Sequence, residues 1–357
     1  MLETTHSERQ DVPHWIEFSA PEVLVQQPLV SVCMITYNHE RYLAEAIEGV
    51  IRQQTSFPVE LIIGEDCSKD RTREIAFEYQ RRFPETIRLI TSKRNIGMQQ
   101  NYHRVIMAAR GKFIAFCEGD DFWHVPDKLQ QQIQFLEHND TFILTCGNYR
   151  SRNVSNGKVT ERSLHVPEHL HEGSLTDDLI LHRLLVKTLT VCARANSVKA
   201  VLKEHVECTS ERFLMADTQT MIELSRLGRV KYMPHVLGTC NELPESASHS
   251  RCPERAFRFM MNTCELKRHY LAKYGLRGGS DRVRLEVIRV SNLELRTASF
   301  SGRVPEAREA FERLKCLRGR SKLTDVFLYW LSRRRFVRES VSLMWRCLGR
   351  AKRRFAD

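Results

Sequence analysis

The segment Phe113-Ile-Ala-Phe-Cys-Glu-Gly-Asp-Asp121 joins an apolar run, typical of a buried strand, to three carboxylates within four residues. Like charges held this close disfavour one another's ionised forms, so the cluster is costly without a cation. Magnesium and manganese bind through one or two carboxylates together with the phosphates of a substrate. The segment therefore predicts a divalent-metal site at a strand end, although a solvated acidic turn would have the same local sequence.

The composition is that of an ordinary globular protein, with 357 residues of which 42% are hydrophobic. No run of 18 apolar residues appears, and the polar N-terminus lacks the apolar middle of a signal peptide. We therefore expect a cytoplasmic protein. Its 11 cysteines are scattered without a Cys-x-x-Cys pair, which favours reduced packing residues over a disulfide framework or a zinc site.

The positive charge is concentrated near the C-terminus. Residues 320–354 contain eleven Lys or Arg against Asp325 and Glu339, so this tail carries +9 of the net +11. The rest of the chain is nearly neutral, which argues against a protein whose whole surface binds nucleic acid. We therefore expect a basic appendage on an ordinary domain and no nucleic-acid partner.

Apolar runs alternate with segments of helical periodicity over the first half of the chain. The runs predict strands at residues 29–35, 59–63, 87–90, 113–117 and 142–146. Asn38 and Asp70 are expected to cap the helices that follow the first two strands. Strands that alternate with helices in this way indicate an α/β fold with a mostly parallel sheet covered on both faces.

Polar residues gather where these predicted strands end. They are Thr36, Tyr37 and Asn38 after the first strand, Glu65 and Asp66 after the second, and Glu118, Asp120 and Asp121 after the fourth. In open α/β sheets ligands bind beyond the carboxyl ends of the strands, so these loops predict a ligand cleft. Neither a Gly-x-Gly-x-x-Gly turn nor a Gly-x-x-x-x-Gly-Lys loop is present, which excludes the common dinucleotide and nucleoside-triphosphate sites.

Four segments in order resemble family 2 glycosyltransferases with the GT-A fold: Val30–Asn38, Glu60–Thr72, Asn95–Asn101 and Glu118–Leu129. The resemblance covers about residues 28–250. It implies a GT-A Rossmann-like catalytic domain at 28–250, an N-terminal extension at 1–27 and a helical basic region at 251–357. It also implies an inverting, metal-dependent transfer of a sugar from a nucleotide sugar, with a UDP-sugar favoured as the donor. The implied acceptor is a saccharide or a lipid-linked molecule in surface polysaccharide or lipopolysaccharide biosynthesis.

The resemblance implies roles for the residues of the nucleotide site. Thr36, Tyr37 and Asn38 would cradle the nucleotide, and Asp120 would contact the ribose. Glu65 and Asp66 occupy the paired-acid position, where a carboxylate accepts the imide N–H of uracil, and Asp66 is favoured as the base reader. Asn95 and Asn101, with Lys93 or Arg94, would line the sugar side.

The implied cofactor is a manganese or magnesium ion. Asp121 would hold it between the two phosphates, with Glu118 and His249 as further ligands. A solvated loop histidine is the alternative for His249.

The resemblance assigns the catalytic base to Asp217, which would take the proton of the acceptor hydroxyl. The alternative is that Asp217 only caps a helix, and Glu211 is then the reserve candidate. Relatives often have Tyr-Arg where this chain has Cys240 and Asn241, which leaves a contact by that pair in doubt.

The C-terminal region predicts helices with basic outer faces. Apolar residues recur at helical spacing between Phe327 and Leu348, including Trp330, Leu331 and Trp345, and Arg residues fill much of the remainder. This pattern suits an anionic membrane surface, as a peripheral protein, or equally a helix packed on the catalytic domain. Two further functional alternatives are a catalytically silent nucleotide-sugar-binding or scaffold protein and an RNA-binding protein acting through the Arg-rich tail.

Overall fold

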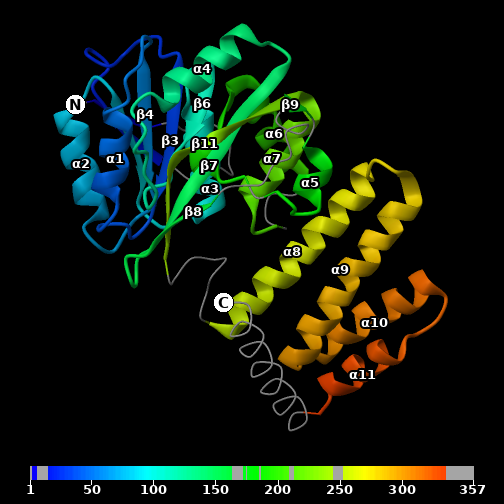
Figure 1. Ribbon diagram of the computed structural model, residues 1–357. Helices are drawn as coiled ribbons and strands as arrows, with labels where there is room; N and C mark the ends of the chain where they lie inside the picture. The colour runs from blue at the N-terminus through cyan, green and yellow to red at the C-terminus, as the bar shows by residue number, and fades with distance from the viewer. Residues whose placement is uncertain are drawn as a thin grey trace. The chain divides into compact units, whose positions relative to one another are not determined.

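The computed structural model describes residues 2–5, 15–162, 172–173, 175–184, 186–208, 213–243 and 252–334. The chain divides into two compact units, Met1–Leu243 and Pro244–Asp357. Figure 1 shows strands and helices in the first unit and helices in the second. The boundary lies close to the one expected at residues 250 and 251.

The first unit contains one sheet with helices on both faces. Its strands are β1 (Leu2–Thr5), β2 (Trp15–Ser19), β3 (Val30–Thr36), β4 (Val59–Glu65), β5 (Ile87–Ser92), β6 (Phe113–Phe116), β7 (Phe142–Asn153), β8 (Val159–Arg162), β9 (Glu172–Gly173), β10 (Cys192–Arg194) and β11 (Arg229–Glu242). Its helices are α1 (Leu43–Ile51), α2 (Thr72–Arg82), α3 (Met98–Ala108), α4 (Lys128–His138), α5 (Thr176–Ile180), α6 (Ala195–Cys208) and α7 (Ala216–Leu227). A 3₁₀ turn covers Thr188–Thr190.

The strands lie in the order β1-β2-β5-β4-β3-β6-β10-β7-β11-β9, with β8 paired to β7. The central strands β5, β4, β3 and β6 are parallel, as expected, and Val32 pairs with Leu61 on one side and Ala115 on the other. β10 runs antiparallel between β6 and β7, while β7 and β11 are parallel. The expected α/β fold is confirmed, with antiparallel strands added around a parallel centre.

The residues expected to form an N-terminal extension contribute to this sheet. β2 pairs antiparallel with β5, with Phe18 opposite Leu89. Residues 15–19 are therefore an edge strand of the first unit.

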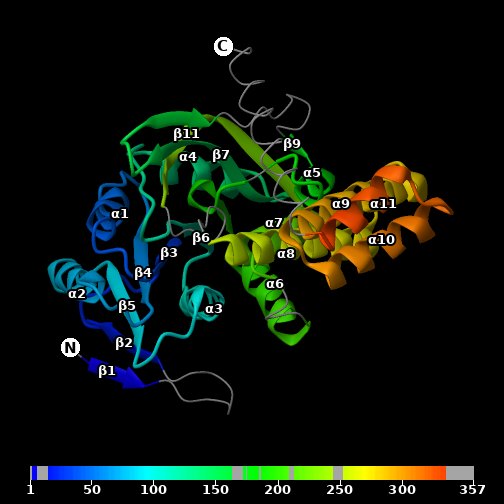
Figure 2. The same ribbon diagram turned by 90° about the horizontal axis from the view of Figure 1, so that it is seen from below.

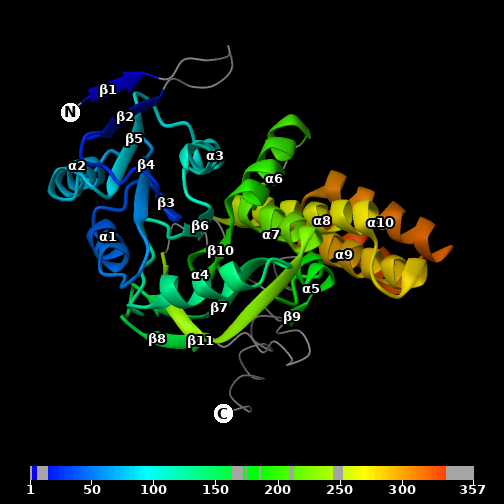
Figure 3. The ribbon, with the colours of Figure 1, turned by 90° about the horizontal axis from the view of Figure 1, so that it is seen from above.

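Helices cover both faces of the sheet. Figures 2 and 3 show α1, α2 and α4 on one face and α3, α6 and α7 on the other. On the first face, Leu43, Ile47 and Val50 of α1 pack with strand residues in a buried apolar core. Because these side chains recur at helical spacing, burial of one helix face explains why this segment forms α1.

The two expected helix caps have different outcomes. Asn38 does not cap α1, which begins at Leu43 after Tyr42 without a side-chain cap. Asn38 instead adopts a left-handed backbone (φ 56°), and its Oδ1 accepts the N–H of Lys69 at 2.9 Å. Asp70 is not the N-cap of α2, which is Arg71 without a side-chain cap, but its Oδ1 accepts the N–H of Thr72, the first residue of α2, at 3.0 Å.

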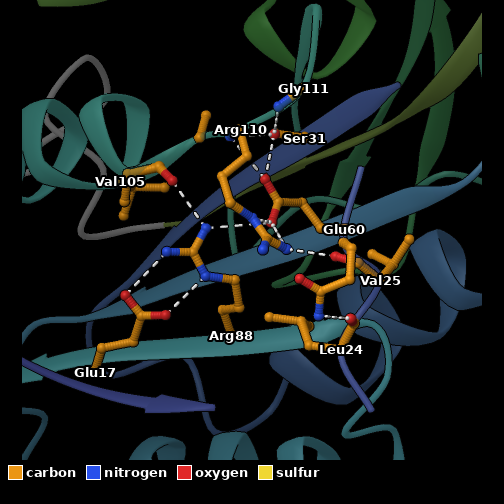
Figure 4. Close-up of polar contacts among 12 residues, drawn as sticks. Glu17, Leu24, Val25, Ser31, Glu60, Arg88, Val105, Arg110 and Gly111 are labelled. Carbon is orange, nitrogen blue, oxygen red and sulfur yellow. Dashed lines mark hydrogen bonds and ion pairs between the residues drawn. The ribbon is translucent and has the colours of Figure 1, made fainter. Parts of the chain in front are cut away.

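A buried ion-pair network ties the amino ends of the central strands together. Glu60 of β4 is fully buried and accepts hydrogen bonds from Ser31 Oγ at 2.6 Å, Arg110 Nε at 2.8 Å and Arg88 Nη1 at 3.2 Å. Arg88 also donates two hydrogen bonds to Glu17, at 2.7 and 2.9 Å, as Figure 4 shows. These contacts join β2, β3, β4, β5 and the end of α3 at the sheet edge opposite the predicted site.

Removing the central carboxylate of this network is expected to destabilise the first unit strongly. Glu60→Ala removes the buried acceptor that Arg110 and Arg88 share, and Arg88 keeps only Glu17 as its carboxylate partner. Breaking a buried pair typically costs about 3–5 kcal/mol. Glu161→Ala is the matched control because that carboxylate pairs with Arg150 while 62% exposed, and such a pair contributes at most about 1 kcal/mol. Urea denaturation measures both free energies of unfolding, and equal losses would contradict a special role for the network.

The second unit is helical over the residues that the structure describes. It contains α8 (Pro253–Tyr274), α9 (Gly279–Ser301), α10 (Val304–Arg318) and α11 (Leu323–Ser332). Leu295, Ala307 and Leu314 belong to its buried apolar cluster. The expected helical C-terminal region is therefore confirmed as far as residue 332, and residues 335–357 lie outside the described part.

Two observations bear on the remaining sequence predictions. Among the described helices, none combines the length and the apolar character needed to cross a membrane. Nine cysteines in the described ranges are free thiols, as expected.

Candidate active site

Three loops meet at the carboxyl ends of the central strands. The carbonyl of Thr36 accepts the N–H of Asp66 at 3.1 Å, which joins the loops after β3 and β4. The carbonyl of Ile35 accepts the N–H of Gly119 at 2.9 Å, which joins the loop after β6 to the same strand. A Cβ at Gly119 would lie 2.6 Å from Thr36 Oγ1, so only glycine permits this close approach.

The acidic loop after β6 holds carboxylates that are poorly solvated. Burial, together with the charges of Asp120 and Asp217, raises the pKa of Glu118 to about 7, although a hydrogen bond from Thr188 opposes the rise. Burial and the charges of Asp120 and Glu118 also raise the pKa of Asp121 well above its usual range. Within the described ranges, Glu118 Oε2 is buried without a hydrogen-bond partner. The hydrogen-bond donors around the loop therefore do not fully balance the negative charge of its carboxylates.

Strand β11 holds this loop in place. The N–H of Asn241 donates to Asp121 Oδ1 at 2.9 Å, and its side-chain amide donates to the carbonyl of Asp120. Phe122 and Thr239 exchange backbone hydrogen bonds of 3.1 and 2.8 Å beside these contacts. Asn241, whose role the sequence left in doubt, is thus a positioning residue for the two aspartates.

The paired acids after β4 have different surroundings. Glu65 accepts hydrogen bonds from the Ser68 N–H at 2.6 Å, Arg73 Nε at 2.5 Å and Thr91 Oγ1 at 3.0 Å. Burial alone would raise the pKa of Glu65, but the hydrogen bonds from Ser68 and Arg73 outweigh it and lower the pKa. Glu65 is therefore an ionised carboxylate that organises the loop.

Asp66 connects the same loop to the segment before α3. Its two carboxylate oxygens accept the N–H groups of Ile96 at 2.8 Å and Gly97 at 2.9 Å. Each oxygen keeps a lone pair for a further donor, since a carboxylate accepts about four hydrogen bonds. This arrangement favours Asp66 over Glu65 as the base reader, which stays a prediction.

The predicted sugar-side residues are largely engaged within the fold. Asn95 Nδ2 donates to the carbonyl of Asp66 at 3.0 Å. Asn101 is buried, and its amide bonds the Gly64 carbonyl at 2.8 Å and Arg104 Nε at 2.9 Å. Lys93 and Arg94, like Tyr37 and Asn38, are exposed. A donor contact by any of these side chains stays a prediction.

Asp217 lies near the acidic loop although almost a hundred residues separate them in the sequence. It is exposed in the first turn of α7, and its charge raises the pKa of Glu118. The N-cap of α7 is Met215, so Asp217 is not the N-cap residue, although its Oδ1 accepts the N–H of Thr218 in the first turn at 2.7 Å. Glu211 and His249, the other two candidates, lie outside the described residues.

Three residues that the sequence did not single out join this group. Thr188 Oγ1 donates to Glu118 Oε1, and His39 Nδ1 lies 3.9 Å from Asp120 Oδ1. Lys187 is half-buried. Burial alone would lower the pKa of Lys187, but interactions with Cys240 and Tyr149, followed by those with Asp121 and Asp217, raise it. A cation therefore stands beside the carboxylates at neutral pH.

Comparison with known proteins finds a family that part of the first unit resembles. Residues 31–201 match the family described as "Glycosyl transferase family 2". The putative teichuronic acid biosynthesis glycosyltransferase TuaG of Bacillus subtilis is 34% identical over 166 residues, 46% of this chain and 62% of TuaG. An uncharacterized protein of Mycobacterium tuberculosis is 44% identical over 115 residues, 32% of this chain and 33% of that protein. The chain thus spans about one third to just under two thirds of these curated relatives.

Solved structures share the fold at low sequence identity. Staphylococcus aureus TarS 1–349 in complex with UDP has a TM-score of 0.51 at 20% identity, covering 88% of this chain and 91% of that chain. The mannosyltransferase PcManGT from Pyrobaculum calidifontis, in complex with GDP-Man and Mn²⁺, has a TM-score of 0.50 at 16% identity, covering 85% and 79%. The first unit therefore has a GT-A fold. The segment 31–201, just under half of the chain, is similar to glycosyl transferase family 2.

Proposed function

We propose that the protein is an inverting, metal-dependent glycosyltransferase that moves a hexosyl group from a nucleotide sugar to a saccharide or lipid-linked acceptor. The observation that carries this proposal is the electrostatic proximity of Asp217, on a separate helix, to the buried acidic loop at the carboxyl edge. An inverting transfer needs both a diphosphate site and a separate carboxylate base. A catalytically silent scaffold, the alternative, would not need a carboxylate base beside the acidic loop.

The donor and pathway are inferred from relatives. TarS binds UDP and UDP-GlcNAc, which supports a UDP-sugar, whereas PcManGT binds GDP-Man, so the same fold also accepts guanine. The name of TuaG supports surface polysaccharide biosynthesis, and lipopolysaccharide is one such product class. An acceptor carried on a lipid would bring the enzyme to the cytoplasmic face of the cell membrane.

A manganese or magnesium ion fits the acidic loop. The unpartnered Glu118 Oε2 and the raised pKa values of Glu118 and Asp121 are what a missing cation would relieve. Nowhere in the described ranges do three or more His, Cys, Asp or Glu side chains form a complete metal site. Asp121 and Glu118 would therefore hold the ion together with substrate phosphates. When bound, the ion would stabilise the charge of the departing diphosphate.

The protein's own side chains supply the remaining steps. Asp66 would accept the uracil imide N–H and Asp120 the ribose hydroxyl, which fixes the donor. Asp217 would take the proton of the acceptor hydroxyl as that oxygen bonds to the anomeric carbon. The bond from the anomeric carbon to the phosphate oxygen breaks on the opposite side, so the configuration inverts. Lys187 would meet the negative charge that develops on the departing diphosphate.

A panel of nucleotide sugars tests this proposal. We expect release of nucleoside diphosphate with manganese or magnesium from one donor class, UDP-sugars first, and NMR of the transferred sugar should show inverted anomeric configuration. Binding of a nucleotide sugar without hydrolysis or transfer to any acceptor would support the silent alternative. Retention of configuration would contradict the role given to Asp217.

Replacing Lys187 by a neutral side chain of similar length is expected to weaken donor binding. Lys187→Met removes a charge-assisted contact with the diphosphate, which corresponds to a loss of about tenfold to a hundredfold in UDP affinity. Lys158→Met, in the exposed turn between β7 and β8, is the matched control. Calorimetric titration with UDP and manganese measures both, and unchanged affinity in Lys187→Met would show that this cation only balances the acidic loop.

A further inference from the structure

Helix α11 of the second unit presents an apolar face to solvent. Leu323 is 88% exposed, Val326 45%, Phe327 48% and Trp330 42%. Their spacing of three, four and seven residues from Leu323 places them on one side of the helix. We call these four residues the α11 face.

The opposite side of α11 is fixed to the rest of the second unit. Leu331 is fully buried, and Leu328 and Tyr329 pack against the apolar cluster that includes Leu314. Asp325 is buried and paired with Arg318. The helix therefore already has its packed side, and the α11 face is a second apolar side. The sequence left open whether Leu331 belongs to a membrane-facing stripe or to a packed side of a helix, and Leu331 lies on the packed side.

Positive charge surrounds the α11 face. The exposed charged residues in and around the helix are Arg320, Lys322, Arg333 and Arg334, all basic. The acid of the helix, Asp325, is buried against Arg318 and presents no charge to a partner. The surface thus combines aliphatic and aromatic side chains with cations at both ends of the helix.

The aromatic residues of the face form one platform. The rings of Phe327 and Trp330 stack with centroids 6.1 Å apart, and the Arg334 guanidinium lies 5.8 Å from the Trp330 ring centroid. Trp residues prefer the boundary between hydrocarbon and water, and nearby Arg or Lys side chains bind anionic headgroups. A helix of 10 residues is too short to cross a bilayer but can lie in its surface.

We propose that the α11 face binds an anionic lipid surface, with Phe327 and Trp330 inserted among the headgroups and the flanking Arg and Lys residues on their phosphates. Charge complementarity favours this partner, because the exposed charges in the helix and at its two ends are positive. The proposal concerns the second unit and does not depend on sugar transfer.

Co-sedimentation of the full chain with vesicles tests the proposal. We expect binding to vesicles of phosphatidylcholine with phosphatidylglycerol, weaker binding to phosphatidylcholine alone, and weakening by salt. In the wild type, about half of each aromatic side chain would leave water on binding to the vesicle. The double variant Phe327→Ser/Trp330→Ser should therefore lose about tenfold or more in vesicle affinity. The double variant Arg333→Ala/Arg334→Ala should lose about fivefold in vesicle affinity for each Arg removed, and only with anionic vesicles.

The matched control is Leu227→Ser, which removes an apolar side chain that is 57% exposed on the first unit. Vesicle affinity of this control should equal that of the wild type, and thermal denaturation should show that all variants fold. Full binding by Phe327→Ser/Trp330→Ser would overturn the proposal. So would retention of the full chain by RNA with no binding to either vesicle set, which would assign the basic region to nucleic acid.

Discussion

Asp217→Asn is expected to lower turnover by about 10²- to 10⁴-fold, the usual contribution of a positioned general base. Asparagine keeps the size of the side chain but cannot take the proton of the acceptor hydroxyl. Because Asp217 is exposed and is not the N-cap residue of α7, the change should leave stability and donor affinity unchanged. Steady-state transfer and calorimetric UDP binding separate the two effects.

Asp281→Asn provides the matched control, since Asp281 is an exposed acid in the first turn of another helix, α9. Its turnover should equal that of the wild type. If Asp217→Asn retained activity within a few fold of the wild type, Asp217 would not be the base. Glu211 would then be the next residue to test.

Asp121→Ala is expected to abolish metal-dependent UDP binding. The variant removes the carboxylate that Asn241 fixes at the centre of the acidic loop. In the wild type, protons compete with the metal because burial raises the pKa of Asp121 and raises that of Glu118 to about 7. The UDP affinity of the wild type should therefore fall as the pH is lowered through about 7, where Glu118 becomes protonated.

Calorimetric titration with UDP at several pH values, once in the presence of manganese and once in the presence of a chelator, measures this effect. Asp140→Ala is the control, because the Asp140 side chain is 92% exposed and far from any assigned role. Wild-type UDP affinity in the presence of chelator would refute the metal assignment. Metal-dependent UDP binding by Asp121→Ala would show that another residue holds the ion.

The parts of the fold that local sequence encodes were predictable. Apolar runs at residues 29–35, 59–63 and 113–117 mark β3, β4 and β6 to within about two residues, because each is buried on both sides. Parallel strands bring their carboxyl ends to one edge, so the convergence of the loops carrying Thr36, Asp66 and Gly119 followed from the strand pattern.

Other parts depend on contacts between distant segments. β10 has only three residues, Cys192–Arg194, and no periodic signal reveals that it lies between β6 and β7. The roles of Asn241 and Lys187 are equally nonlocal, since β11 and the 3₁₀ turn bring them to the acidic loop. Asn38 failed as a cap because its side chain bonds the loop after β4 instead. A single sequence gives local propensities for helix, strand and turn, whereas contacts with distant segments determine where these residues lie.

The most direct measurement is a crystal structure of the full chain with UDP and manganese. The proposed site predicts the uracil ring beside Asp66, and the diphosphate and the ion beside Asp121 and Glu118 at the carboxyl edge of β3, β4 and β6. Lys187 should lie beside the diphosphate, and Asp217 on the side from which an acceptor approaches. Nucleotide density elsewhere on the molecule, or an ion held without Asp121, would contradict the assignment of this edge as the nucleotide-sugar site.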